Sequence, residues 1–152
     1  FISTSDHCGC DNLDLWSQHI WIIDYKNISD VLKKLSKLDK SKLIIFSIHW
    51  GSNWLDKMPI EMMEFGKILI DNGVDIVFGH SAHHIPPVPV KIYKNKLIIF
   101  GLGDFINDYA VDRKYKSDQS LMCMLDTTLN EYSLIPVKRK FIGKSSIPIP
   151  RT

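Results

Sequence analysis

The chain has 152 residues, of which 45% are hydrophobic and 24% are charged, a composition typical of a soluble globular protein with one core. Its 19 basic and 17 acidic residues give a formal net charge of +2, so nothing in the charge points to a nucleic-acid or membrane-surface partner. No apolar run approaches the ~20 residues that cross a bilayer, and three cysteines without framework spacing argue against a disulfide scaffold.

The first 19 residues are polar and irregular, and we expect a loop there, followed by a short strand over residues 21–25. Cys8 and Cys10 form a C-x-C pair beside His7, which is a weak indication of structural zinc. No second cysteine or histidine pair nearby completes the four ligands that such a site needs. We therefore do not assign a zinc site to this segment.

The next part of the chain alternates between helices and strands. Residues 27–39 carry apolar side chains at helical spacing, and a second helix is predicted from Pro59 to the Asn72-Gly73 pair. Residues 43–48 and 74–78 are apolar, β-branched runs of the kind found in buried parallel strands. This strand–helix–strand order with short links predicts an α/β fold with a parallel sheet.

Beyond residue 78 the pattern changes to extended segments without helices. A proline-rich stretch excludes helix, and Lys94-Asn95-Lys96 has the composition of a hairpin turn. We expect an extended loop over residues 85–89 and a first hairpin over residues 90–100. A loop over the functional site is expected at residues 103–120, a second hairpin at 121–137 and a proline-containing tail at 143–152. Residues 1–152 are expected to form a single domain.

Three histidines lie at the ends of two predicted strands. His49 follows one apolar run, His80 occupies the same place one strand later, and His83 comes three residues further on. Neighbouring parallel strands are ~4.8 Å apart, and α/β sheets bind ligands where such strands end. We therefore expect His49 and His80 to share one ion and His83 to reach it or an adjacent one. The alternative is that each histidine only caps its strand by hydrogen bonding.

Neutral imidazole nitrogens are better ligands for transition metals than for magnesium or calcium. We accordingly expect one or two divalent ions, namely Zn, Mn or Fe. Such ions activate water for hydrolysis, and a pair of them can clamp a phosphate group. A two-metal site would also need carboxylate ligands, which the three histidines do not supply.

Other polar and aromatic residues surround the histidines in the sequence. We interpret His84 as a structural residue or as a partner of a ligand, rather than as a ligand itself. Asp104 and Asp108 follow another apolar strand, where they could ligate metal, accept the N–H of a histidine, or serve as turn residues. Trp50 and Trp54 either line a pocket above the histidines or pack into the core.

Three blocks of the sequence resemble the CapA family. They are Ile48-His49-Trp50-Gly51, residues 69–83 ending in Gly79-His80-Ser81-Ala82-His83, and residues 92–105 ending in Gly101-Leu102-Gly103-Asp104-Phe105. Members of this family are poly-γ-glutamate capsule biosynthesis proteins, related in fold to calcineurin-like metallophosphoesterases. The resemblance implies part of a four-layer αββα sandwich, a mixed sheet with C-terminal β-hairpins, and a site for one or two divalent metals.

The resemblance also implies roles for the three histidines. In related phosphoesterases, a histidine after one strand and two in a G-H-x-H turn are metal ligands at the catalytic centre. Carried over, His49 and His80 would bind one metal and His83 the other. This chain has one more residue between the last two histidines than the phosphoesterase turn.

Two functions follow from the resemblance. The first is a metal-dependent hydrolase of phosphoester or amide-type bonds, acting on a small molecule or on a polymer such as polyglutamate. The second is a non-catalytic scaffold that binds polymer or partner proteins, and a purely structural histidine site is a third option. The phosphoesterase pattern starts with a half that carries aspartates and an asparagine, whereas residues 2–7 resemble the middle of the domain. We therefore expect a C-terminal portion of an envelope-associated protein.

Overall fold

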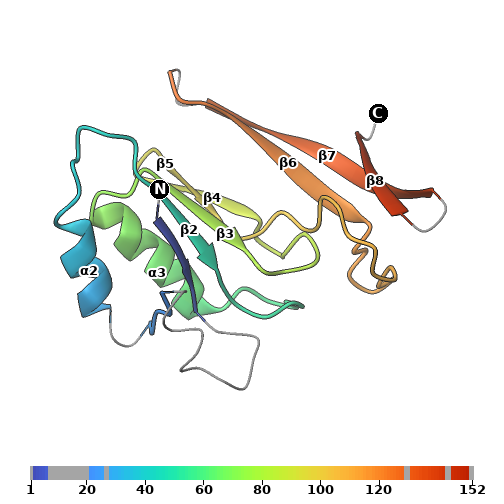
Figure 1. Ribbon diagram of the computed structural model, residues 1–152, viewed down its shortest axis with the longest axis horizontal. Helices are drawn as coiled ribbons and strands as arrows, with labels where there is room; N and C mark the ends of the chain where they lie inside the picture. Colours follow the sequence, from blue (N-terminus) through green and yellow to red (C-terminus); the bar gives the residue numbers. More distant parts are fainter. Residues whose placement is uncertain (1, 7–20, 26–27, 129–130, 143–144, 151–152) are drawn as a thin grey trace.

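The computed structural model describes residues 2–6, 21–25, 28–128, 131–142 and 145–150 (Figure 1). Within these residues the elements follow in the order β1 (Ile2–Ser5), α2 (Ser29–Leu35), β2 (Ile45–His49), α3 (Ile60–Asp71), β3 (Ile76–His80), β4 (Val90–Tyr93), β5 (Lys96–Ile99), β6 (Gln119–Asp126), β7 (Glu131–Ile142) and β8 (Ser145–Pro150).

The larger sheet has five strands in the order β1-β2-β3-β5-β4. Strands β1, β2, β3 and β5 are parallel, and β4 is antiparallel to β5 at the edge. The α/β class and the mixed sheet predicted from the sequence are confirmed. The register pairs His49 with His80, so these two strand ends lie directly beside each other.

Both helices cover one face of this sheet (Figure 1). Alternate residues of a strand point to opposite faces, and Phe46, Ile48 and Val77 point toward the helices. They pack with Val31 and other buried residues of the helices, strands and connections, namely Ile23, Leu35, Ile44, Trp50, Met62, Phe65, Leu69, Ile70, Val74, Ile98 and Phe100. Burial of this apolar surface provides the main stabilisation of the sheet.

Helix α3 ends where the sequence predicts, at Asn72-Gly73. Gly73 adopts a φ of +93°, its N–H bonds the carbonyl of Ile70 at 3.1 Å, and the Val74 N–H bonds that of Leu69 at 3.1 Å. These two bonds form a Schellman motif, which satisfies the last carbonyls of the helix. The chain then enters β3 directly, which sets where His80 stands.

Helix α2 is shorter than the predicted 27–39 segment. After Leu35 the backbone bonds tighten from i→i−4 to i→i−3, as in the contacts from Lys37 to Lys34 and from Leu38 to Leu35, each at 3.2 Å. The Ser36 hydroxyl also donates to the carbonyl of Lys33 at 2.9 Å. A serine that competes for a helix carbonyl in this way favours an early end to the helix.

The first hairpin turns at two residues, Lys94 and Asn95, whose φ angles are 50° and 58°. Two consecutive left-handed residues are the geometry of a type I′ turn, which fits the twist of antiparallel strands. The predicted hairpin is therefore present, with a two-residue rather than a three-residue turn.

The smaller sheet, β6-β7-β8, is antiparallel and lies across the larger sheet from the helices (Figure 1). The Leu121 N–H donates to the carbonyl of Leu102 at 2.8 Å, and an apolar groove runs between the sheets, with Phe78 and Ile99 on one side and Cys123 on the other. The described residues thus form helix, sheet and sheet layers. A complete four-layer sandwich is not shown by this part of the chain.

Two segments that we expected to be irregular are strands. Residues 2–5 pair in parallel with Phe46–His49, and residues 145–150 pair antiparallel with β7. Pro148 and Pro150 are compatible with β8 because it is an edge strand, whose outer side needs no N–H donor. Conversely, residues 21–25 contribute isolated bridge positions rather than a strand. The Cys8, Cys10 and His7 cluster lies outside the described residues.

Candidate functional site

His49 and His80 form a close imidazole pair at the carboxyl edge of the larger sheet. Their Nδ1 atoms are 3.2 Å apart, and the ring centroids are 5.2 Å apart with an interplanar angle of 58°. The Ser47 hydroxyl lies 3.3 Å from Nε2 of His80. Two ring nitrogens at this distance either share a hydrogen bond or direct their lone pairs at a common cation. The expected juxtaposition of these two histidines is what the structure shows.

Strand alternation places this pair on the sheet face that the helices leave free. Phe46 and Ile48 point into the helical core, so Ser47 and His49 point to the side of the smaller sheet. Partial desolvation at the exposed end of β3 lowers the pKa of His80, and the nearby His49 charge lowers it further. His80 therefore stays neutral at pH 7, which is the form that offers a lone pair.

Trp50 is a core residue and not part of a pocket wall. Its side chain is 1% exposed, its ring stacks on Phe100 at a centroid distance of 5.5 Å, and its Nε1–H donates to the Phe100 carbonyl at 2.9 Å. The indole passes beneath Gly79, where a Cβ atom would lie only 2.1 Å from Nε1. Glycine before His80 is thus required by the packing of Trp50.

His83 is held by Asp104, with Nδ1 3.0 Å from each carboxylate oxygen. Because an ionised carboxylate only accepts, Nδ1 is the nitrogen that carries the proton, and the lone pair of the neutral ring is on Nε2. Asn107 donates its amide N–H to the same carboxylate. Of the three roles considered for Asp104, the structure shows it as the acceptor of a histidine N–H. Asp108 lies exposed in the same loop.

The three histidines are not gathered around one point. Within the part of the chain that the structure describes, no three histidine, cysteine, aspartate or glutamate side chains are grouped to hold an ion. His49 and His80 form one pair, and His83 with Asp104 forms another. The turn that carries His83 is fixed from the other side by its backbone N–H, which donates to the Asn53 carbonyl at 3.0 Å.

His84 is buried, and both of its ring nitrogens contact the backbone. It is 3% exposed, its Nε2 accepts the Leu55 N–H at 2.9 Å, and its Nδ1 donates to the Ile85 carbonyl at 2.9 Å. Both ring nitrogens are engaged, so no lone pair remains for a metal. Burial lowers the pKa of His84, although the Ile85 carbonyl acts in the opposite direction.

Trp54 forms an exposed aromatic wall next to His83. Its ring stacks on Tyr115 at 4.9 Å and on His84 at 5.9 Å, and its centroid is 5.8 Å from that of His83. At 37% exposure, part of the ring is open to solvent. Of the histidines, Trp54 therefore contacts His83 and His84.

Three residues outside the sequence motifs support the two pairs. Ser47 contacts His80, Asn107 contacts Asp104, and Arg139 donates to the Asn107 carbonyl. Ser47 had a usable signal, because it stands two residues before His49 on the same strand face. Arg139 shares a strand face with Val137, and both are buried, whereas Lys138 and Lys140 are exposed.

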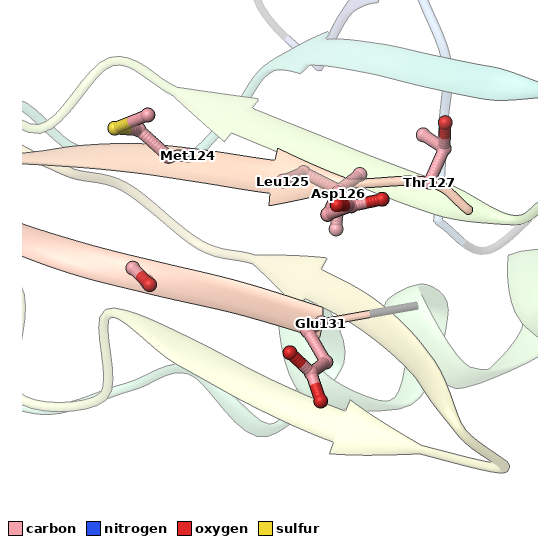
Figure 2. Close-up of a pocket in the computed structure, with 6 residues that line it drawn as sticks. Met124, Leu125, Asp126, Thr127 and Glu131 are labelled. Carbon is pink, nitrogen blue, oxygen red and sulfur yellow. The ribbon is translucent and has the colours of Figure 1, made fainter. Parts of the chain in front are cut away.

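A separate hollow lies at the tip of the β6–β7 hairpin, where Figure 2 shows Asp126 and Glu131 near Met124, Leu125 and Thr127. This is the far end of β6 from Leu121, which bonds the loop that carries Asp104. The hollow is lined by two carboxylates and no histidine, so we do not connect it with the histidine pairs. Among the described helices, none is long and apolar enough to span a membrane.

Comparison with known proteins places these features in a family. The model of the bacterial capsule synthesis protein PGA_cap matches residues 5–109, a range that contains His49, His80, His83 and Asp104. Two strains of Mycobacterium tuberculosis have a "Probable polyglutamine synthesis accessory protein" that is 32% identical over 135 residues, or 86% of this chain and 34% of the relative.

Two Bacillus proteins are also similar. The capsule biosynthesis protein CapA of Bacillus anthracis is 31% identical over 88 residues, which cover 55% of this chain and 21% of that protein. The PGA biosynthesis protein CapA of Bacillus subtilis is 26% identical over 71 residues, covering 47% and 18%. The chain spans about a third of the length of the mycobacterial relatives. Because the family model matches more than half of the chain, this protein belongs to the bacterial capsule synthesis family PGA_cap.

Proposed function

We propose that this chain carries a divalent-metal site with phosphoesterase-like hydrolase activity, and that this activity serves the synthesis of capsular polyglutamate at the cell envelope. The observation that carries the proposal is the 3.2 Å separation of the His49 and His80 Nδ1 atoms at the end of two parallel strands. Both imidazoles belong to the carboxyl edge of the sheet, the usual place for ligands in α/β folds.

The spacing of the pair fits a shared transition metal. Zinc–nitrogen bonds of 2.0–2.1 Å in a tetrahedral arrangement place two ligand nitrogens about 3.3 Å apart. His49 and His80 would hold the ion, Zn, Mn or Fe, and further ligands would come from solvent or from outside the described residues. A divalent ion bound here supplies Lewis-acid polarisation of a phosphoryl or carbonyl oxygen.

The protein's own groups orient the site. The Ser47 hydroxyl contacts His80 Nε2 and restricts rotation of that ring. Asp104 holds the proton of His83 on Nδ1, so the atom that His83 offers is Nε2, either to a second ion or to a proton. Trp54 adds partly exposed apolar surface on which a substrate can rest.

The substrate class comes from the relatives. Their names place them in polyglutamine synthesis and capsule biosynthesis, and we extend this role to the present chain. The bond to be cleaved is then an amide of the polymer or a phosphoester of a small molecule. Both reactions develop negative charge on an oxygen, which a metal can stabilise.

One observation favours the second candidate, a non-catalytic scaffold that binds polymer or partner proteins. Each of the two pairs, His49 with His80 and His83 with Asp104, contains only two side chains that could bind a metal. Among the described residues, no three such side chains are grouped. Two imidazoles alone hold a metal less tightly than the three or four protein ligands of most zinc enzymes. A scaffold would need the fold and the exposed Trp54 but no bound ion.

A hydrolysis assay separates the two candidates. The chain is incubated with bis(p-nitrophenyl) phosphate or poly-γ-glutamate in the presence of Zn, Mn or Fe, alongside a His49→Gln/His80→Gln variant. Lys57→Gln, an exposed change in the loop after β2, is the control. We expect metal-dependent hydrolysis that the double variant loses and the control keeps. Polymer binding without hydrolysis under any metal, equal in all three proteins, would establish the scaffold instead.

A further inference from the structure

Arg139 is a buried arginine on the smaller sheet, and its contacts lead to His83. We propose that Arg139 is a positioning residue for the candidate site, because it fixes the loop after β5 so that Asp104 sets the proton position of His83. The role of His83 in chemistry rests on the proposed function, whereas the contacts that position it do not.

The guanidinium clamps two parts of the loop at once. Arg139 is 3% exposed, one terminal nitrogen (Nη1) donates to the Asn107 carbonyl, and the other (Nη2) donates to the Ser117 carbonyl at 2.9 Å. Its backbone N–H donates to the Asp118 carbonyl at 2.7 Å. The segment between Asn107 and Ser117 is thereby closed onto strand β7.

The chemistry of arginine suits this position. A buried charge is costly unless its N–H groups find acceptors, and here the two terminal nitrogens donate to carbonyl oxygens from two separate parts of the loop. The planar fork of a guanidinium presents two donors at a fixed angle, whereas the ammonium of lysine is a single point charge. A lysine at residue 139 would therefore lose at least one of the two carbonyl contacts.

Asn107 passes this constraint to Asp104. Its side-chain oxygen accepts the Tyr109 N–H at 2.6 Å, so the amide nitrogen faces the other way and donates to the Asp104 carboxylate. The carboxylate in turn accepts the Nδ1–H of His83. The path from the smaller sheet to the imidazole thus runs through four residues, from Arg139 to the Asn107 backbone carbonyl and then from the Asn107 amide through Asp104 to His83.

The consequence is a defined tautomer. The neutral histidine side chain in water favours the proton on Nε2, and the hydrogen bond at the other nitrogen decides which form a protein holds. With Asp104 in place, the proton of His83 is on Nδ1 and the Nε2 lone pair is free for an ion or a proton. Loosening Asp104 would let the proton return to Nε2 and remove that lone pair.

The test is the tautomer of His83, read by ¹⁵N NMR of the imidazole in the metal-free, substrate-free chain at about pH 8, where histidine is neutral. We compare Arg139→Lys and Asn107→Ala with Lys140→Gln, an exposed change on the same strand. We expect the Nδ1–H form in the parent chain and in Lys140→Gln. Both loop variants should lose the Nδ1–H signal and shift toward Nε2–H.

Asn107→Ala keeps Arg139 and both carbonyls that Arg139 binds. This variant therefore tests the hydrogen-bond path to His83 even if Arg139→Lys weakens the fold. An Nδ1–H signal of His83 that persists in a folded Asn107→Ala chain would overturn the proposal, as would an Nε2–H form in the parent chain. The measurement needs neither metal nor substrate. A negative hydrolysis assay would therefore not contradict the positioning role of Arg139, and a negative NMR result would not contradict the metal site.

Discussion

Gly79→Ala is the substitution whose effect the structure specifies most closely. A Cβ at residue 79 would lie 2.1 Å from Nε1 of Trp50, 2.6 Å from Cε2 of the same ring, and 2.6 Å from the Ile99 carbonyl oxygen. None of these atoms can easily move away from an added methyl group. The indole is 1% exposed and stacked on Phe100, and the carbonyl belongs to the backbone of β5.

The cost has two parts. Overpacking a well-filled core costs about 1–3 kcal/mol, and displacing the indole also removes the hydrogen bond from Nε1 to the Phe100 carbonyl, worth about 1 kcal/mol. The free energy of unfolding should therefore fall by about 2–4 kcal/mol. For a chain of this size, that corresponds to a decrease in Tm of roughly 4–16 °C.

The assay is equilibrium unfolding in urea, followed by tryptophan fluorescence and by far-UV circular dichroism. Gly101→Ala is the matched control, because a Cβ there would meet its nearest neighbour, Cγ of Pro86, at 3.5 Å, an ordinary contact. We expect the control to lie within about 1 kcal/mol of the parent chain. Equal destabilisation by both substitutions would refute the packing argument for Gly79.

Two further predictions concern positions away from the site. Burial raises the pKa of Asp75, but hydrogen bonds from Lys96 and from the Ile44 N–H, at 2.8 Å each, outweigh it and lower the pKa overall. A lowered folded-state pKa stabilises the protein above the unfolded pKa of about 3.9, and this stabilisation is lost as the pH falls below that value. Asp75→Asn should lower the free energy of unfolding by about 1 kcal/mol at pH 7, and this difference from the parent chain should disappear in acid. Urea titrations in which the difference does not change with pH would contradict this. Gly73→Ala should lower the free energy of unfolding by about 1 kcal/mol, because alanine is strained at a φ of +93°. The nearby Lys40 side chain is exposed and can move away from the added methyl group. An unchanged Tm would contradict this account of the helix end.

The central part of the fold could be predicted from the sequence because its signals are local. Residues 43–48 and 74–78 are apolar runs with glycine or histidine at their ends, and the helix that precedes each run has apolar residues at helical spacing. Strands β1 and β8 lacked such signals. Residues 2–5 alternate in a polar segment, and the prolines of residues 145–150 argue against a strand unless its place at the edge of the sheet is known.

The same distinction holds for the site. His49 and His80 could be paired in advance because adjacent parallel strands bring their ends together. The partners of His83 could not be fixed, because Asp104 comes from a loop whose path depends on Arg139, 32 residues after Asn107. Loop conformations set by such distant contacts leave no periodic pattern in the sequence.

The metal content of the purified chain tests the central claim most directly. The parent chain, the His49→Gln/His80→Gln variant and the Lys57→Gln control would each be loaded with Zn, Mn or Fe, dialysed and measured by elemental mass spectrometry. We expect about one ion per chain in the parent and the control, lost in the double variant while the fold is retained. Equal and near-zero metal in all three folded proteins would contradict the proposal that the histidine pair is a metal site.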